Sequence, residues 1–315
     1  MKNVERRPQA VMLSKRANVF YLEHVRIMQR EDRVVYCTEF ADGVEKFFSI
    51  ADKNTAFILL GKGTSITDAA VRKLSESNVL IGFSGSGGAP FFSGIDPVFL
   101  LPQDEYRPTD HAQKWFNLWS IEPQRVAMGR ALLEYRATWT KEMYERLGVS
   151  VDSSVFSDFF SRLEYCTSST ALLSCEAVFA KRLYATFARF YKVEEFTRTA
   201  GAKKNETLIQ RINSFIDHGN YLAYGYAGVA LHGMGIPFFL PVLHGKTRRG
   251  GLVFDIADLF KDWLVLPAAF DHGSKNNKKD SDFRASVIEL ALKYEVLDRV
   301  MNFISDLPEK ISKNQ

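Results

Sequence analysis

The spacing of apolar residues changes abruptly near residue 100. Before this point the apolar residues form short runs, such as ANVFYLE at 17–23, separated by polar turns, which is typical of strands in a meander or small sandwich. After it they recur at the three- and four-residue spacing of long helices. Residues 97–109 contain three prolines and no apolar period. The sequence therefore predicts an α+β protein with a β-rich domain at 1–98, a linker at 99–109 and a larger, all-helical domain at 110–315.

The second domain is predicted to be a series of helices. Pro123 suits the first turn of a long helix that Gly148 closes, because proline lacks the N–H that a first turn leaves unpaired. The run NNKKDSD at 276–282 predicts a polar loop, and 305–315 predicts a solvated tail. The predicted helices cover 110–119, 123–147, 156–165, 170–191, 207–231, 254–266 and 285–304.

The composition is that of a globular protein of the cytoplasm. A net charge of +4 on 315 residues identifies no anionic partner unless the cations cluster. Cys37, Cys166 and Cys175 lack CxxC spacing, which argues against a zinc knuckle or disulfide framework and for a reducing compartment. Residues 221–243 carry no Lys, Arg, Asp or Glu, but their glycines and prolines favour a buried helix followed by an apolar loop over a membrane span.

Two glycine-rich turns resemble nucleotide-binding motifs, and neither fits. The run GKGTS at 61–65 lacks the upstream glycine of a phosphate-binding loop, and Gly63 stands where Ser or Thr should follow the lysine. In GSGG at 85–88, a dinucleotide fingerprint would need glycine at position 90, which is Pro90. Both are predicted to be turns between strands.

The stretch HGKTRRGGLVFDIAD at 244–258 combines an imidazole, three cations and two acids spaced three residues apart. Three residues apart on a helix is one face, so Asp255 and Asp258 would point the same way. Their neighbours are apolar, and a buried carboxylate is costly unless a charged partner satisfies it. A divalent cation held by His244 and an Asp would do so. The alternatives are a packed histidine and acids that cap a helix or form ion pairs.

Glu176 is a further acid that is predicted to be buried, because the residues three and four positions away from it are apolar. A glutamate on such a stripe is uncommon unless it is a ligand or is paired with a cation, for which Lys181 and Arg182 are candidates. Glu, His and Asp without cysteine form a ligand set that suits Mn²⁺ or Mg²⁺ and would also accept zinc.

Two other residues near this set are predicted to lie outside it. Asp262 comes four residues after Asp258, and we expect it to be a surface acid beside Lys261. His232 comes twelve residues before His244. It is a reserve ligand for which we favour a packing role.

Cationic side chains gather near both acidic segments. Eight Lys and Arg residues lie between 181 and 211, with aromatic residues interleaved, and three more follow His244. Such cations neutralise phosphates with little sequence preference, although a solvated helix face is the alternative. Beside a buried acid–His set they favour a phosphodiester substrate. The predicted DNA-binding residues are Lys181, Arg182, Lys246, Arg248 and Arg249.

Several ordered segments resemble the Cas-one family, the integrase/endonuclease of the CRISPR spacer-acquisition complex, and most nearly its type I-F branch. They are ILLGKGTSITDAAVRKL with GFSGSGG, ALLSCEAVFAKRLY, INSFIDHGNYLAYGYAGVAL and HGKTRRGGLVFDIADLF. The resemblance implies an N-terminal β-rich dimerisation domain and a helical catalytic domain. It also implies that Glu176, His244 and Asp258 are catalytic and bind the metal, Mg²⁺ or Mn²⁺. Asp255 would be a supporting or alternate ligand.

The resemblance further implies an activity and partners. A 3′ hydroxyl of short foreign DNA would attack a phosphodiester at the repeat boundary of the CRISPR array, which inserts a spacer for antiviral defence. The protein would act as a homodimer with the small second subunit of the acquisition complex, which is fused to a helicase–nuclease in this branch. From the residues alone, a metallophosphoesterase for small nucleotides and a non-catalytic DNA-binding scaffold stay open as alternatives.

Overall fold

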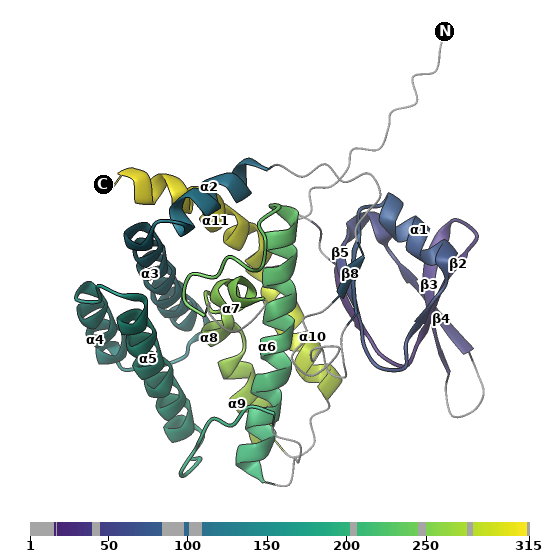
Figure 1. The fold of residues 1–315 in the computed structure, drawn as a ribbon. Coiled ribbons are helices and arrows are strands. Elements are labelled where there is room, and N and C mark those ends of the chain that lie inside the picture. Colours follow the sequence, from purple (N-terminus) through teal and green to yellow (C-terminus); the bar gives the residue numbers. More distant parts are fainter. Residues whose placement is uncertain are drawn as a thin grey trace. The chain divides into compact units, whose positions relative to one another are not determined.

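The computed structural model describes residues 16, 18–39, 45–83, 98–100, 109–201, 207–244, 250–275 and 280–313. These residues fall into two compact units, divided between Leu100 and Thr109. The first unit is rich in strands and the second is helical (Figure 1), so the predicted α+β fold is confirmed. Most of the predicted linker lies outside the described residues, but Phe99 and Leu100, which were assigned to it, belong to a strand instead.

The N-terminal unit contains two four-stranded sheets in its described part. The strands are β1 (Asn18–Leu22), β2 (Arg26–Arg30), β3 (Arg33–Glu39), β4 (Glu45–Ile50), β5 (Thr55–Leu60), β6 (Ser65–Ile66), β7 (Leu80–Phe83) and β8 (Val98–Leu100). In one sheet β1, β5 and β7 are parallel and β8 is antiparallel to β7. In the other, β2, β3 and β4 form an antiparallel meander, and β6 joins β2 in parallel.

One apolar core connects these two sheets and helix α1 (Asp68–Glu76). Every residue of β5 is buried, as expected for a central parallel strand that is covered on both faces. Ile58 and Leu60 of β5 enter this core together with Ile27 of β2 and Leu74 of α1. Side chains alternate along a strand, so Ile58 and Leu60 lie on the same face of β5.

The C-terminal unit is a bundle of helices. They are α2 (Asp110–Trp119), α3 (Glu122–Leu147), α4 (Ser153–Glu164), α5 (Ser169–Phe190), α6 (Leu208–Gly233), α7 (Gly251–Ala257), α8 (Lys261–Leu264), α9 (Leu266–Ser274), α10 (Asp280–Lys293) and α11 (Val296–Lys313). Helix α6 packs against α7, α9, α10 and α11, and α3 packs against α5 and α8 (Figure 1). None of the helices in the described ranges combines the length and apolar character that a membrane span requires. The packing brings α3, α5 and the α7–α8 segment together.

The helix predicted over 254–266 is divided in the structure. It comprises most of α7, all of α8 and the first residue of α9. Phe260 has a φ of −135°, which interrupts the helix between α7 and α8. Pro267 lies in the first turn of α9, where proline is tolerated, and it would not fit the interior of a continuous helix.

The prediction for residues 285–315, a helix followed by a solvated tail, is also wrong in part. The helix predicted over 285–304 is two helices, because Glu295 takes a φ of +49° between α10 and α11. Helix α11 then continues past Pro308, with Leu307 and Ile311 buried, where a solvated tail was predicted. The apolar spacing persists beyond the proline, and burying those side chains outweighs the single backbone hydrogen bond that proline removes.

Candidate metal centre

Asp255, near the end of α7, holds the segment that carries His244. Its Oδ2 accepts hydrogen bonds from the backbone N–H groups of Val242 (2.5 Å) and Leu243 (3.1 Å). Its Oδ1 accepts from the backbone N–H of His244 (3.1 Å) and lies 2.8 Å from His244 Nδ1. An Nδ1–H that donates to this carboxylate leaves Nε2 unprotonated and able to bind a metal. Asp255 binds the His244 segment through both oxygens and does not belong to the group of converging ligand atoms, which fits a supporting role better than that of an alternate ligand.

The segment that carries His244 packs closely against the start of α7. The indole Nε1–H of Trp119 donates to the carbonyl oxygen of Pro241 at 2.6 Å. A Cβ added at Gly251 would lie 2.7 Å from Pro241 Cβ and 3.2 Å from the carbonyl oxygen of His244. Glycine at position 251 therefore allows a close approach that places His244 beside α7.

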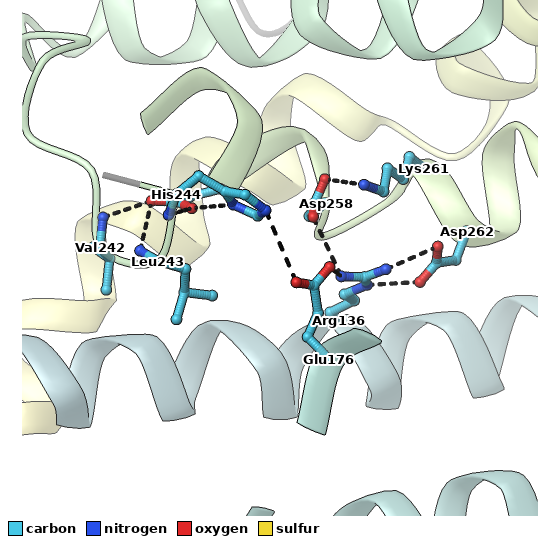
Figure 2. A network of polar contacts seen from close by, with 9 residues as sticks. Arg136, Glu176, Val242, Leu243, His244, Asp258, Lys261 and Asp262 are labelled. Atoms are coloured by element: carbon cyan, nitrogen blue, oxygen red, sulfur yellow. Dashed lines mark hydrogen bonds and ion pairs between the residues drawn. The ribbon is translucent and has the colours of Figure 1, made fainter. Parts of the chain in front are cut away.

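Three predicted ligands meet at this point. Glu176 comes from the middle of α5, Asp258 follows α7, and one ligand atom from each of Glu176, His244 and Asp258 lies within 4.8 Å of the others. Glu176 Oε2 is 3.9 Å from His244 Nε2, and Figure 2 shows the two side chains pointing toward each other. Ligand atoms that each lie about 2.0–2.4 Å from one ion can be this far apart, so two carboxylates and one imidazole fit a divalent metal. Their role as ligands stays a prediction.

A buried arginine that the sequence analysis missed lies behind these ligands. Arg136 of α3 is 1% exposed. Its Nε and Nη2 donate to Asp262 Oδ2 (2.6 Å) and Oδ1 (3.1 Å), and its Nη1 donates to Glu176 Oε1 (2.6 Å) and Asp258 Oδ2 (3.3 Å) (Figure 2). Lys261 Nζ pairs with the other oxygen of Asp258. The sequence held a signal for Arg136, because three of the four residues three and four positions away from it are apolar, namely Leu132, Leu133 and Trp139.

Opposite charges keep these cations ionised. Burial alone would lower the pKa of Arg136, but the charges of Asp262, Asp258 and Glu176 raise it well above its ordinary value. Burial opposes Lys261 in the same way, and Asp258 raises its pKa overall. Formally, the four carboxylates at 176, 255, 258 and 262 against these two cations leave two negative charges, which one divalent cation would balance.

The pKa of His244 is also shifted. Burial lowers its pKa, but the hydrogen bond to Asp255 and the charges of Asp258, Asp255 and Glu176 together raise the pKa above its ordinary value. The imidazole therefore binds a proton more readily than an isolated histidine, and a proton on Nε2 competes with a metal for the same lone pair.

The prediction for Asp262 is wrong. It is 3% exposed and forms the bidentate pair with Arg136, while its neighbour Lys261 pairs with Asp258. Arg136 lies 126 positions earlier in the chain, so no local pattern could indicate this partner. For the same reason the cation that pairs with Glu176 is Arg136, whereas Lys181 and Arg182 were the local candidates.

The chain is similar in sequence to proteins of a known family. Residues 22–305 match the family model described as CRISPR associated protein Cas1. The chain belongs to the Cas1 family. A CRISPR-associated endonuclease Cas1 from Pseudomonas aeruginosa (strain UCBPP-PA14) is 39% identical, with 96% of each chain covered. The membership predicted from the sequence is thereby confirmed.

Solved Cas1 structures share the fold. A CAS1 protein from Thermotoga maritima superposes with a TM-score of 0.71 at 16% identity, covering 93% of this chain and 96% of that one. A TtCas1–DNA complex superposes with a TM-score of 0.66 at 20% identity, covering 92% of this chain and 91% of that one.

Two of the five residues that were predicted to bind DNA lie in the part of the chain that the structure describes. Lys246, Arg248 and Arg249 lie outside the described residues. Lys181 is exposed on α5, whereas Arg182 donates to Asp158 Oδ2 at 2.6 Å. His232 lies in the last turn of α6 and is not part of the ligand group found among the described residues.

Proposed function

We propose that this chain is a metal-dependent DNA endonuclease and integrase of CRISPR adaptation, which inserts short foreign DNA into the CRISPR array for antiviral defence. The observation that carries the proposal is the convergence of Glu176, His244 and Asp258, from separate segments, within 4.8 Å in a chain of the Cas1 family. The Pseudomonas aeruginosa relative is named an endonuclease, and the TtCas1 structure is a DNA complex. Family membership does not favour a small-nucleotide phosphoesterase or a non-catalytic scaffold.

Mg²⁺ or Mn²⁺ is the cofactor that we propose for this site. Glu176, His244 and Asp258 would hold it, because carboxylate oxygens and one imidazole suit these ions and the site's formal charge calls for a dication. When bound, the cation would offset negative charge on the phosphodiester under attack.

The chain's own residues prepare this chemistry. Asp255 fixes the tautomer and orientation of His244, and Arg136 and Lys261 hold the two carboxylates in place. In the proposed reaction, the 3′ hydroxyl of the incoming DNA gives up its proton to solvent, and its oxygen forms a bond to the phosphorus at the repeat boundary. The bond from that phosphorus to the 3′ oxygen of the target strand breaks, and this oxygen takes up a proton.

We also propose the partners and location that go with this activity. The strand-rich unit would form the homodimer, and the small second subunit, fused to a helicase–nuclease as in type I-F systems, would bridge two dimers. Lys181, Arg182, Lys246, Arg248 and Arg249 would contact the phosphate backbone of double-stranded DNA. A cytoplasmic location is supported by the three cysteines, all within the described residues, which form no disulfide.

Strand transfer tests this function directly. A short duplex with 3′ hydroxyl ends is incubated with a repeat-bearing plasmid, the partner subunit and Mn²⁺ or Mg²⁺, and joined products are counted with and without EDTA. We expect EDTA, Glu176→Gln, His244→Ala and Asp258→Asn each to lower transfer at least about a hundredfold. Asp271→Asn is the control, because that acid lies on α9 and pairs with Lys275. Full transfer by the His244→Ala protein would contradict the proposal.

A further inference from the structure

We propose that Arg136, anchored by Asp262, is a positioning residue that holds Glu176 and Asp258 at the spacing which the metal requires. The inference rests on the proposed function, because it concerns the same site. It assigns roles to two residues that bind no metal themselves.

The nitrogens of the guanidinium group donate hydrogen bonds to different carboxylates. Asp262 takes Nε and Nη2 in a bidentate pair, which fixes the plane of the group. The remaining Nη1 is then directed at one oxygen of Glu176 and one oxygen of Asp258. Because both carboxylates share a single nitrogen that cannot rotate away, neither can move without breaking a hydrogen bond.

The arrangement leaves the metal-facing side of Glu176 available. Nη1 contacts Oε1, while Oε2 lies 3.9 Å from His244 Nε2. Asp262 pairs with Arg136 through both of its oxygens and is not one of the three residues whose ligand atoms converge among the described residues. The guanidinium group thus orients the ligands without occupying the position between Glu176 and His244.

Electrostatics points to the same role. Two carboxylates that must share one ion repel each other, and without a nearby cation they would separate or bind a proton. Arg136 offsets this repulsion from a fixed point at which its side chain is 1% exposed, so water screens the interaction little. A lysine would supply the charge but not the fork of donors, because its ammonium group cannot bind Asp262 in two places and two further carboxylates at fixed angles.

The test compares two variants of the full chain for Mn²⁺ binding, followed by the electron paramagnetic resonance signal of free Mn²⁺, and for strand transfer. Arg136→Lys keeps the positive charge but removes the guanidinium N–H donors that are held at fixed angles. The double variant Arg136→Met/Asp262→Leu removes the pair without changing the formal charge of the site, and apolar replacement of a buried ion pair commonly preserves the fold. We expect each to weaken Mn²⁺ binding by about 10–100-fold, as is usual for residues that orient metal ligands. The Mn²⁺ concentration for half-maximal transfer should rise by the same factor.

Glu142→Gln is the matched control. It alters an arginine–carboxylate contact on the same helix, where Glu142 pairs with Arg299 and Arg146, and it should leave Mn²⁺ affinity unchanged. Folded variants at Arg136 that bind Mn²⁺ as tightly as the wild type, or more tightly, would overturn the inference. A wild-type protein that neither binds Mn²⁺ nor transfers strands would instead contradict the proposed function, so the two failures are distinguishable.

Discussion

Helix α3 carries two networks of arginine and carboxylate that differ in burial. The buried network consists of Arg136, Glu176, Asp258 and Asp262, and the arginine at its centre is 1% exposed. The surface network consists of Glu142, Arg146 and Arg299, and about a third of the Glu142 and Arg299 side chains is exposed. The contacts are of the same chemical kind, so the comparison isolates the effect of the surroundings.

Burial makes the first network costly to disturb and the second tolerant of change. Coulomb attraction weakens as the effective dielectric constant rises, and exposed ion pairs contribute little to stability. Arg299 also lies over the Trp139 ring at 4.6 Å and donates to Tyr135 Oη at 3.2 Å, so the surface network mainly attaches α11 to α3. The buried network contains Glu176 and Asp258, two of the three proposed metal ligands, so a change in it is expected to affect function.

The largest expected effect is on stability, from Arg136→Ala. The substitution leaves the carboxylates of Glu176, Asp258 and Asp262 without this cation. Breaking a buried network in this way commonly costs about 3–5 kcal/mol of the free energy of unfolding. Urea denaturation of the variant and the wild type measures the difference. A loss below about 1 kcal/mol would show that the two networks do not differ as burial implies.

Gly251→Ala would disturb the His244 side of the metal centre without changing any charge. The added Cβ would lie 2.7 Å from Pro241 Cβ, so the segment that carries His244 must shift. We expect strand transfer to fall about tenfold or more, because small displacements of reacting groups are costly. The control is Gly219→Ala on α6, where the added Cβ would crowd Val265 Cγ1 at 2.3 Å but leave the His244 segment in place. Equal losses of transfer in both variants would indicate general destabilisation.

A smaller effect is expected from pH. Because the pKa of His244 is raised above its ordinary value of 6.5, the imidazole is neutral, and available to a metal, only above the raised pKa. Mn²⁺ affinity should therefore be full at higher pH and should fall about tenfold per pH unit below that pKa, starting above pH 6.5. Mn²⁺ titrations across this range locate the midpoint. A midpoint below 6.5 would contradict the influence of Asp255 and its neighbours on His244.

The smallest effect is expected from Glu142→Gln. Arg299 keeps its contacts with Tyr135 and Trp139, and the lost ion pairs are partly exposed. The free energy of unfolding should fall by no more than about 1 kcal/mol, with strand transfer unchanged. A loss as large as that of Arg136→Ala would remove the distinction between the networks, and thermal unfolding of both variants in parallel decides this.

Local patterns in the sequence predicted much of the fold. Apolar spacing together with Pro123 and Gly148 placed the long helices α2, α3, α5 and α6 close to their observed ends. The parallel pairing of β1, β5 and β7 was not predictable in this way, since it depends on contacts between distant strands. The strand β2 was missed because its sequence RIMQR is mostly polar, with only Ile27 fully buried.

The candidate site was likewise predictable only where local patterns in the sequence indicate it. A buried acid on an apolar stripe signals that a partner exists, and this reasoning singled out Glu176 and Asp258. It does not identify the partner, because Arg136 is 40 positions from Glu176 and 126 from Asp262. Local reasoning therefore offered Lys181 and Arg182 as candidate partners of Glu176, and it placed Asp262 on the surface beside Lys261.

If Glu176, His244 and Asp258 bind one dication together, crystals of the active protein soaked in Mn²⁺ should show the ion between them. Anomalous diffraction should show a peak within about 2.0–2.4 Å of a carboxylate oxygen of Glu176, of His244 Nε2 and of a carboxylate oxygen of Asp258. The same soak of Glu176→Gln crystals should show a much weaker peak. If active wild-type crystals bind Mn²⁺ elsewhere and leave these three side chains without a peak, the account is contradicted.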